Sequence, residues 1–121
     1  MNLTTPKAYI ATKWENRARA AELAEILEQY GWEITRKWWA YPSFEVVTPE
    51  YQQAEAIDDI AAVRAADVVY VIMEKDLPYR GAWAEFGAAL AFGKPVFVIG
   101  EEAKKCVFAY HPLVTFVEWP L

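Results

Sequence analysis

The chain has 121 residues, of which 55% are hydrophobic and 24% are charged, and its formal net charge at pH 7 is −5. This length suits one domain, and the composition is that of a globular rather than a disordered protein. The acidic balance argues against a nonspecific nucleic-acid binder, which needs a basic face, but it is compatible with a small nucleotide as ligand.

Residue types that would support several other kinds of chemistry are scarce. One cysteine, Cys106, allows no internal disulfide, and one cysteine with one histidine cannot form a zinc site. The single serine, Ser43, and His111 do not suggest a catalytic triad, and neither a GxGxxG nor a GxxxxGK[ST] motif occurs. We therefore expect no metal and no cofactor, and we expect Cys106 to be buried and inert.

The sequence also bears on location. No charged and then apolar leader opens it, and no apolar run approaches about 18 residues. We therefore expect a cytoplasmic protein that makes no membrane contact.

In chain order, the first predicted elements are a strand over 7–12, a helix over 16–30 and a second strand over 32–38. The helix is indicated by apolar residues three and four positions apart, and Gly31 ends it. The second strand is indicated by alternation in the sequence WEITRKW. A strand, a helix and a strand with short connections predict a right-handed βαβ unit in a parallel sheet.

A loop over 41–49 with prolines near both ends precedes a second helix, predicted over 51–66. The apolar stripe of this helix consists of Ala54, Ile57, Ile60, Ala61 and either Val63 or Arg64. The apolar, β-branched run over 68–73 is typical of a strand buried on both faces. Asp67 opens this strand, at the end that lies away from a ligand site. A polar loop over 74–80 follows.

The stretch 80–99 has the most distinctive pattern in the chain. It predicts a short loop, a helix over 82–92 that ends at Gly93, and a buried strand over 95–99; a final strand is expected over 113–117. Glu85 would lie in the first turn of the helix, where the helix dipole stabilises a carboxylate by roughly 0.3–1 kcal/mol. Any acid there gains as much, so the unusual feature of Glu85 is its setting among small and apolar residues.

Together these elements predict an α/β fold, with one doubly wound parallel sheet of about five strands in a flavodoxin- or Rossmann-like three-layer sandwich over residues 1–121. In such folds the ligand binds beyond the carboxyl ends of the strands, near the point where the strand order reverses. The loops over 11–15, 38–42 and 74–81 would meet there. Glu85 lies just after the third of these loops, so the fold and this acid indicate one site.

These residues form a pattern that resembles the nucleoside 2-deoxyribosyltransferase family, which includes 2′-deoxynucleoside 5′-monophosphate N-glycosidases. The resemblance rests on the sequence GAWAEFGAALAFGKPV over 81–96, which contains Glu85, and on the strand that begins after Asp67. Tyr9 in the first strand and Asp59 on the second helix match at fitting positions. The end of the chain, with VFAYHP and Trp119, resembles a compact branch of the same superfamily.

The resemblance implies cleavage of the N-glycosidic bond of a (deoxy)nucleoside or nucleotide. In that family the glutamate that matches Glu85 attacks C1′ of the sugar and expels the base, and the covalent glycosyl-enzyme passes the sugar to another base or to water. A carboxylate in this place also stabilises an oxocarbenium-like transition state, as in retaining glycosidases. Asp59 would hold or protonate the base, and Tyr9 would hydrogen-bond and orient Glu85.

Five more residues are expected to contact this small-molecule substrate. Trp14, Trp38 and Trp83 would stack on the base, and Arg80 and Gly81 would meet the 5′ side of the sugar. The six Trp and seven Tyr also exceed what one small domain readily buries, so we expect a homodimer or a larger homo-oligomer.

Alternatives remain open from the sequence. Asp58 is as available as Asp59, and Glu85 is also readable as an ordinary helix acid. Tyr79 stands where the family's transferases have an aspartate, and the phosphate-binding serine of the monophosphate hydrolases is missing, with Arg80 in the loop instead. A non-catalytic nucleotide-binding or sensing module is therefore the second interpretation, and a domain that docks a protein partner is the third.

Overall fold

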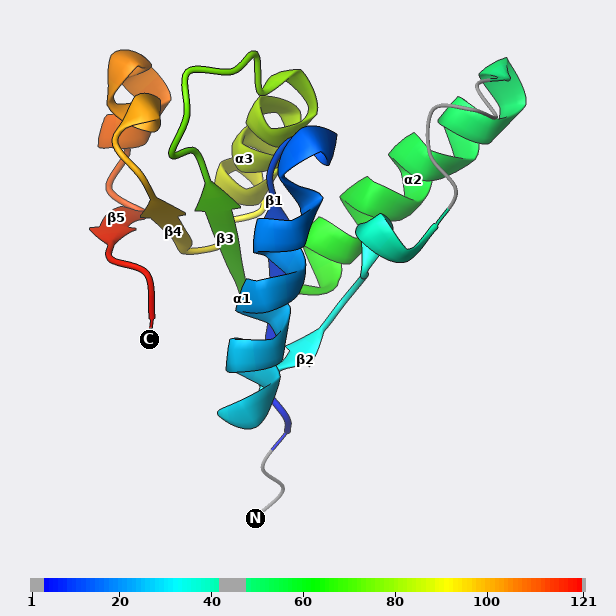
Figure 1. The fold of residues 1–121 in the computed structure, drawn as a ribbon, viewed down its shortest axis with the longest axis horizontal. Coiled ribbons are helices and arrows are strands. Elements are labelled where there is room, and N and C mark those ends of the chain that lie inside the picture. Colours follow the sequence, from blue (N-terminus) through cyan, green and yellow to red (C-terminus); the bar gives the residue numbers. More distant parts are fainter. Residues whose placement is uncertain (1–3, 42–47, 121) are drawn as a thin grey trace.

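A computed structural model of the chain describes residues 4–41 and 48–120 (Figure 1). Most of the predicted loop over 41–49, with Ser43, therefore lies outside the described residues. No helix in the described part of the chain is long and apolar enough to cross a membrane. The strands and α-helices are β1 (Lys7–Ala11), α1 (Arg17–Gln29), β2 (Glu33–Ile34), α2 (Pro49–Ala65), β3 (Val68–Ile72), α3 (Arg80–Ala91), β4 (Val96–Ile99) and β5 (Val114–Val117).

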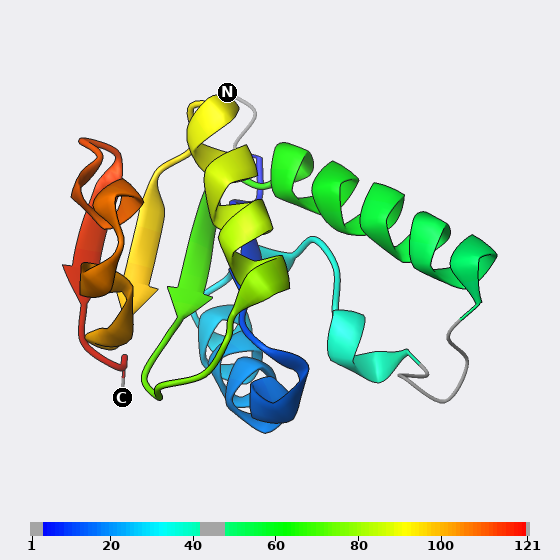
Figure 2. The same cartoon turned by 90° about the horizontal axis from the view of Figure 1, so that it is seen from above.

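The five strands form one parallel sheet in the order β2-β1-β3-β4-β5. The connection from β1 through α1 leads to one side of β1, and the later connections lead to the other side, so the order reverses between β1 and β3. Helix α1 covers one face of the sheet, and α2 and α3 lie side by side on the other (Figure 2). The predicted doubly wound α/β fold is confirmed.

The core follows from the buried central strands and from one face of each flanking helix. Ala8–Ala11 of β1 are fully buried between β2 and β3, and α1 buries residues at helical spacing. Helix α2 begins at Pro49, two residues before the predicted start, because the Thr48 hydroxyl accepts a hydrogen bond from the Tyr51 amide (3.1 Å) and Pro49 occupies the first turn.

The second strand is much shorter than predicted, with two residues instead of seven. After β2, side-chain hydrogen bonds take the place of the sheet ladder. The Thr35 hydroxyl donates to the Ala62 carbonyl (3.0 Å), and the Trp38 indole donates to the Ile10 carbonyl (2.7 Å). The Thr35 amide also donates to the Ala8 carbonyl of β1 (2.9 Å), so the segment stays tied to both β1 and α2, and Trp38 lies in a short 3-10 helix.

Two helices differ from expectation. Most of the predicted stripe of α2 is on the outside: Ala54, Ile57, Ile60 and Ala61 are exposed, with Ile57 at 60%, and of the stripe only Val63 is buried, beside Ala62. Helix α3 starts at Arg80, two residues early, so Glu85 lies in its second turn and the expected gain from a first-turn dipole does not apply. Cys106 is partly rather than fully buried.

We expect Gly100→Ala to destabilise the protein by at least about 2 kcal/mol. Gly100 has φ +108°, and an added Cβ would lie 2.2 Å from the Met73 carbonyl oxygen, at the start of the loop that leads to α3. Gly87→Ala, in the middle of α3 with nothing within 4 Å, should instead stabilise it by about 0.5–1 kcal/mol. Denaturant unfolding of both variants measures the contrast, and equal effects would contradict it.

Candidate active site

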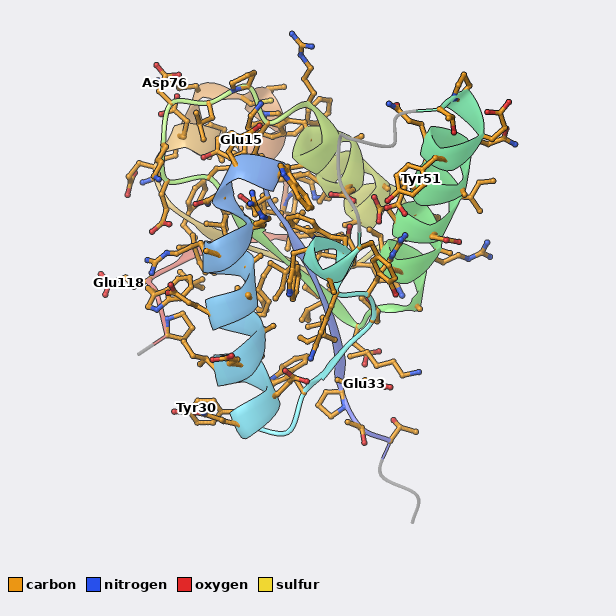
Figure 3. All side chains as sticks on the ribbon, turned by 45° about the vertical axis from the view of Figure 1, so that its right-hand side comes forward. Glu15, Tyr30, Glu33, Tyr51, Asp76 and Glu118 are labelled. Carbon is orange, nitrogen blue, oxygen red and sulfur yellow. The ribbon has the colours of Figure 1, made fainter. Side chains whose placement is uncertain are left out.

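A cleft of about 770 Å³ opens at the carboxyl ends of β1 and β3, beside the point where the strand order reverses. One side is formed by the segment after β1, with Glu15, and the other by α2, with Tyr51 (Figure 3). Of the eight residues predicted for the site, the structure brings seven to this cleft: Tyr9, Trp14, Trp38, Asp59, Arg80, Gly81 and Glu85.

Glu85 is the buried acid of the cleft, with 9% of its surface exposed. The α3 face that holds it also buries Ala82, Phe86 and Ala89, so its carboxyl group has little access to water. Burial raises the pKa of Glu85 to about 8, against a hydrogen bond from Tyr9 that lowers it; the charge of Asp59 raises it further. Glu85 therefore holds its proton over most of the neutral range.

Tyr9 lies under Glu85 on β1 and is fully buried. Its hydroxyl donates a hydrogen bond to Glu85 Oε2, which is the contact that the sequence predicts. Burial, with the nearby charges of Glu85 and Asp59, holds the pKa of Tyr9 well above its usual value. The phenol therefore remains a donor, and it fixes one carboxylate oxygen while it favours ionisation of Glu85.

Asp59, rather than Asp58, faces the cleft from α2. The Asp59 side chain is 26% exposed and lines the cleft, whereas that of Asp58 is 63% exposed. Burial raises the pKa of Asp59 to about 6; Arg36 opposes this rise, and the acids Glu55 and Asp58 add to it. A carboxyl group with this pKa can hold or give up a proton near neutral pH, as a general acid or base must.

Arg36, which binds Asp59 from behind the cleft, was not singled out from the sequence. It follows β2, and its guanidinium donates to Asp59 Oδ1 (3.1 Å) and to Glu55 Oε1 (2.9 Å), with Asp58 at 3.8 Å. The Arg36 side chain is only 10% exposed. Arg36 lies in the segment that was predicted as a strand. An arginine in such an alternating segment is expected on the surface, so the sequence did not indicate its contacts with Asp59 and Glu55.

Trp14 and Trp38 form an aromatic wall of the cleft, with ring centroids 6.3 Å apart. The indole of Trp38 is anchored by its hydrogen bond to Ile10, and its other side contacts Trp39 (5.3 Å). Trp83 is not among the residues that line the cleft in the described structure. It packs on Phe86 instead, one helical turn along α3, with ring centroids 5.0 Å apart. Trp83 is therefore not placed to stack on a base in the cleft, contrary to the expectation from the sequence.

Two cations lie at the mouth of the cleft. Arg80 and Gly81 begin α3, and both line the cleft; the Arg80 amide itself donates to the Pro78 carbonyl (2.9 Å). Lys13, which the sequence reasoning did not single out, lies across from them; its amine is 3.3 Å from the Pro78 carbonyl and 3.6 Å from Glu15. Within residues 4–41 and 48–120, no His, Cys, Asp and Glu group is arranged to hold a metal ion.

The chain was compared with known families and structures. A family profile described as nucleoside 2-deoxyribosyltransferase matches residues 8–114. No curated protein sequence gives a significant match.

Three similar solved structures share this fold. The CMP N-glycosidase BcmB of Clostridium botulinum has a TM-score of 0.65 at 19% identity, over 93% of this chain and 88% of that one. A 2-deoxyribosyltransferase of Bacillus psychrosaccharolyticus has a TM-score of 0.62 at 22% identity, over 78% of this chain and 72% of that one. A conserved protein of Enterococcus faecalis V583 has a TM-score of 0.61 at 21% identity, over 89% of this chain and 71% of that one.

The profile covers most of the chain, including β1 with Tyr9, α2 with Asp59 and α3 with Glu85. The TM-scores of these structures show that they share the overall fold of this chain. The chain therefore belongs to the nucleoside 2-deoxyribosyltransferase family, whose enzymes transfer or hydrolyse the glycosyl group of nucleosides and nucleotides.

Proposed function

We propose that this protein cleaves the N-glycosidic bond of a (deoxy)nucleoside or nucleotide through a covalent glycosyl-enzyme on Glu85, and passes the sugar to a second base or to water. The observation that carries the proposal is the buried Glu85–Tyr9 pair, which shares a cleft with Asp59 and an aromatic wall. Two carboxyl groups with raised and different pKa values are the groups that glycosyl transfer requires.

The reacting state has Glu85 ionised and Asp59 protonated, which is a minor ionisation state of the pair between pH 6 and pH 8. In the first step, the ionised Glu85 oxygen attacks C1′ while the bond from C1′ to the base nitrogen breaks, and the bonding electrons leave with the base. Asp59 gives its proton to the departing base, so a neutral base is released. Tyr9 holds the other carboxylate oxygen and keeps the attacking oxygen directed into the cleft. The positive charge that develops on the sugar is stabilised by the adjacent carboxylate.

In the second step, a base or a water molecule attacks C1′, and the bond between C1′ and Glu85 breaks. Asp59, now ionised, accepts the proton of the attacking group, so both carboxyl groups return to their starting state. Trp14 and Trp38 would contact the base, and Arg80, Gly81 and Lys13 would lie toward the 5′ side of the sugar. No cofactor is needed for either step.

One observation favours the non-catalytic binding module as the second candidate. The position six residues before Glu85 holds Tyr79, a buried side chain whose hydroxyl accepts a hydrogen bond from the Lys75 amide (3.2 Å). Tyr79 thus fixes the loop and supplies no carboxylate there. A module that binds nucleotides without turnover would keep the cleft and lack the chemistry.

The deciding experiment is a chromatographic assay of deoxynucleosides, ribonucleosides and their 5′-monophosphates, each with and without a second free base. Release of free base supports hydrolysis, and a new nucleoside supports transfer. If nothing turns over while nucleotides raise the melting temperature, the binding module is supported instead. If the protein shows no turnover and nucleotides do not stabilise it, both candidates are contradicted.

We further propose that the protein is a cytoplasmic homodimer whose interface includes the outer face of α2. This face carries Ala54, Ile57, Ile60 and Ala61, all exposed, on the side of the helix opposite to the cleft. The charges of α2 are self-complementary, since Glu50 lies in its first turn and Arg64 in its last. Two copies of α2 packed antiparallel about a two-fold axis would bury the apolar residues and pair opposite charges.

Ile57→Asp should convert the dimer into a folded monomer, because it places a charge at the centre of the apolar face of α2. Light scattering after size-exclusion chromatography measures the mass. Tyr30→Asp is the matched control, since Tyr30 is 75% exposed at the end of α1. A monomeric wild type, or dissociation by the control alone, would contradict this interface.

A further inference from the structure

We propose that Arg36 is a positioning residue for the acid of the site: its guanidinium group fixes Asp59 and Glu55 against the end of β2 and so holds Asp59 at the cleft beside Glu85. The inference rests on the proposed function, in which Asp59 exchanges a proton with the base. Arg36 is not among the residues that line the cleft, so it acts through Asp59.

Arg36 attaches the part of α2 that lines the cleft. The buried residues of α2, Ala62 and Val63, belong to its C-terminal part, whereas the cleft is lined by residues one to three turns earlier. The two guanidinium nitrogens bind Asp59 Oδ1 at 3.1 Å and Glu55 Oε1 at 2.9 Å, one turn apart on the helix. The fork therefore fixes both the rotation of α2 and the direction of the Asp59 carboxyl group.

The charges around Asp59 make this contact important. Asp59 is accompanied by Glu55, Asp58 and Tyr51 on its own helix, by Arg36 after β2, and by Tyr9 and Glu85 across the cleft. Arg36 is the cation among these described groups. Without it, the carboxyl groups of Asp59, Glu55, Asp58 and Glu85 would lose this nearby positive charge, and the pKa values of Asp59 and Glu85, both of which Arg36 lowers, would rise.

The guanidinium itself is held in place. It lies over the ring of Tyr41, 4.8 Å from the ring centroid, and its side chain is only 10% exposed. A buried, stacked and forked arginine is not equivalent to lysine, because an amine supplies the charge but neither the plane nor the two parallel donors. Replacing Arg36 by lysine therefore tests whether the positive charge alone is sufficient or whether the planar, two-donor geometry is also needed.

The test compares Arg36→Met, Arg36→Lys and Arg19→Met in base release across pH. Arg19 is a matched control: it forms a fork with Glu74 (2.9 and 3.0 Å) and lies 3.4 Å over the ring of Trp119, away from the cleft. For Arg36→Met we expect kcat to fall roughly 10- to 100-fold with little change in KM, and the pH profile to shift to higher pH. Arg36→Lys should restore the pH profile more than it restores kcat.

A readout independent of activity is the titration of the Asp59 carboxyl carbon by 13C NMR in the wild type and in Arg36→Met. An upward shift in the variant supports the inference even if the wild type releases no base, in which case only the proposed function fails. An unchanged Asp59 titration overturns the inference. A wild-type pH profile and kcat in Arg36→Met, with a loss of melting temperature like that of Arg19→Met, would also overturn it, because Arg36 would then be merely structural.

Discussion

Glu85→Gln is expected to abolish base release and, at the same time, to make the folded protein more stable above neutral pH. Glutamine retains the size of glutamate and can accept the hydrogen bond from Tyr9, but it cannot form the glycosyl ester. Loss of the nucleophile in other covalent enzymes costs about 10⁴–10⁶ in rate, and we expect at least about 10⁴-fold here. Single-turnover assays with excess enzyme measure the loss.

The gain in stability follows from the pKa of Glu85, which is about 8 in the folded protein against an ordinary value of 4.5. The unfolded chain ionises Glu85 above about pH 4.5, whereas the folded protein keeps it protonated up to about pH 8. Stability is therefore lost as the pH rises through this window, by roughly 3–5 kcal/mol if each pKa unit contributes about 1.4 kcal/mol. Glutamine does not titrate, so this loss disappears in the variant.

Urea unfolding at pH 5 and pH 8 tests the linkage. The free energy of unfolding of Glu85→Gln should exceed that of the wild type at pH 8, and the difference should be much smaller at pH 5. Glu25→Gln, an exposed acid on α1, is the control and should change neither activity nor this pH dependence. An active Glu85→Gln variant would reduce Glu85 to an ordinary helix acid, and a variant less stable at pH 8 would contradict the cost of burying the carboxylate.

The sequence led to Glu85, Tyr9 and Asp59 because the resemblance fixed their spacing along the chain and the doubly wound fold brought the ends of β1 and β3 together. The parallel sheet itself follows from local patterns, namely buried β-branched runs that alternate with helices. The choice between Asp58 and Asp59 did not follow from local pattern. It depends on the rotation of α2, which is fixed by Ala62 and Val63 in the core and by the fork of Arg36.

The differences from expectation share a physical cause. Periodicity identifies which residues of a helix form an apolar stripe, but it does not show whether the sheet, another helix or another subunit packs against that stripe. In α2 the part of the stripe that contains Ile57 faces outward. Similarly, β2 stops early because Thr35 and Trp38 find carbonyl partners in α2 and β1, and such tertiary bonds are not visible in a seven-residue pattern. The packing of the partly buried Trp83 on Phe86 is likewise a tertiary arrangement that the local pattern does not specify.

Asp59→Asn is expected to lower base release by about 10²–10³-fold and to change the shape of its pH profile. In the wild type, Glu85 must be ionised and Asp59 protonated in the first step. With pKa values of about 8 and about 6, the two requirements give a bell whose limbs lie near pH 6 and pH 8. Because the charge of Asp59 raises the pKa of Glu85, the two titrations are coupled, and these limbs belong to the pair rather than to either residue.

In the Asp59→Asn variant, Glu85 is the one member of the pair that still titrates. The remaining activity should rise with pH to a plateau, without the decline above pH 8, and its midpoint should lie below 8 because the charge of Asp59 no longer raises the pKa of Glu85. Asp58→Asn is the control one residue away; its side chain is 63% exposed, and the bell should survive with nearly full activity. A bell-shaped profile in Asp59→Asn would contradict the assignment.

The leaving group separates proton donation from mere binding of the base. A purine that is already alkylated at N7 carries a positive charge and departs without further protonation. If Asp59 supplies the proton, Asp59→Asn should cleave 7-methyl-2′-deoxyguanosine nearly as fast as the wild type, while its defect on 2′-deoxyguanosine remains. Equal defects on both substrates would show that Asp59 holds the base without protonating it. The acid would then have to be another group in the cleft, while the role of Glu85 as nucleophile would be untouched, because attack at C1′ does not depend on how the base is neutralised.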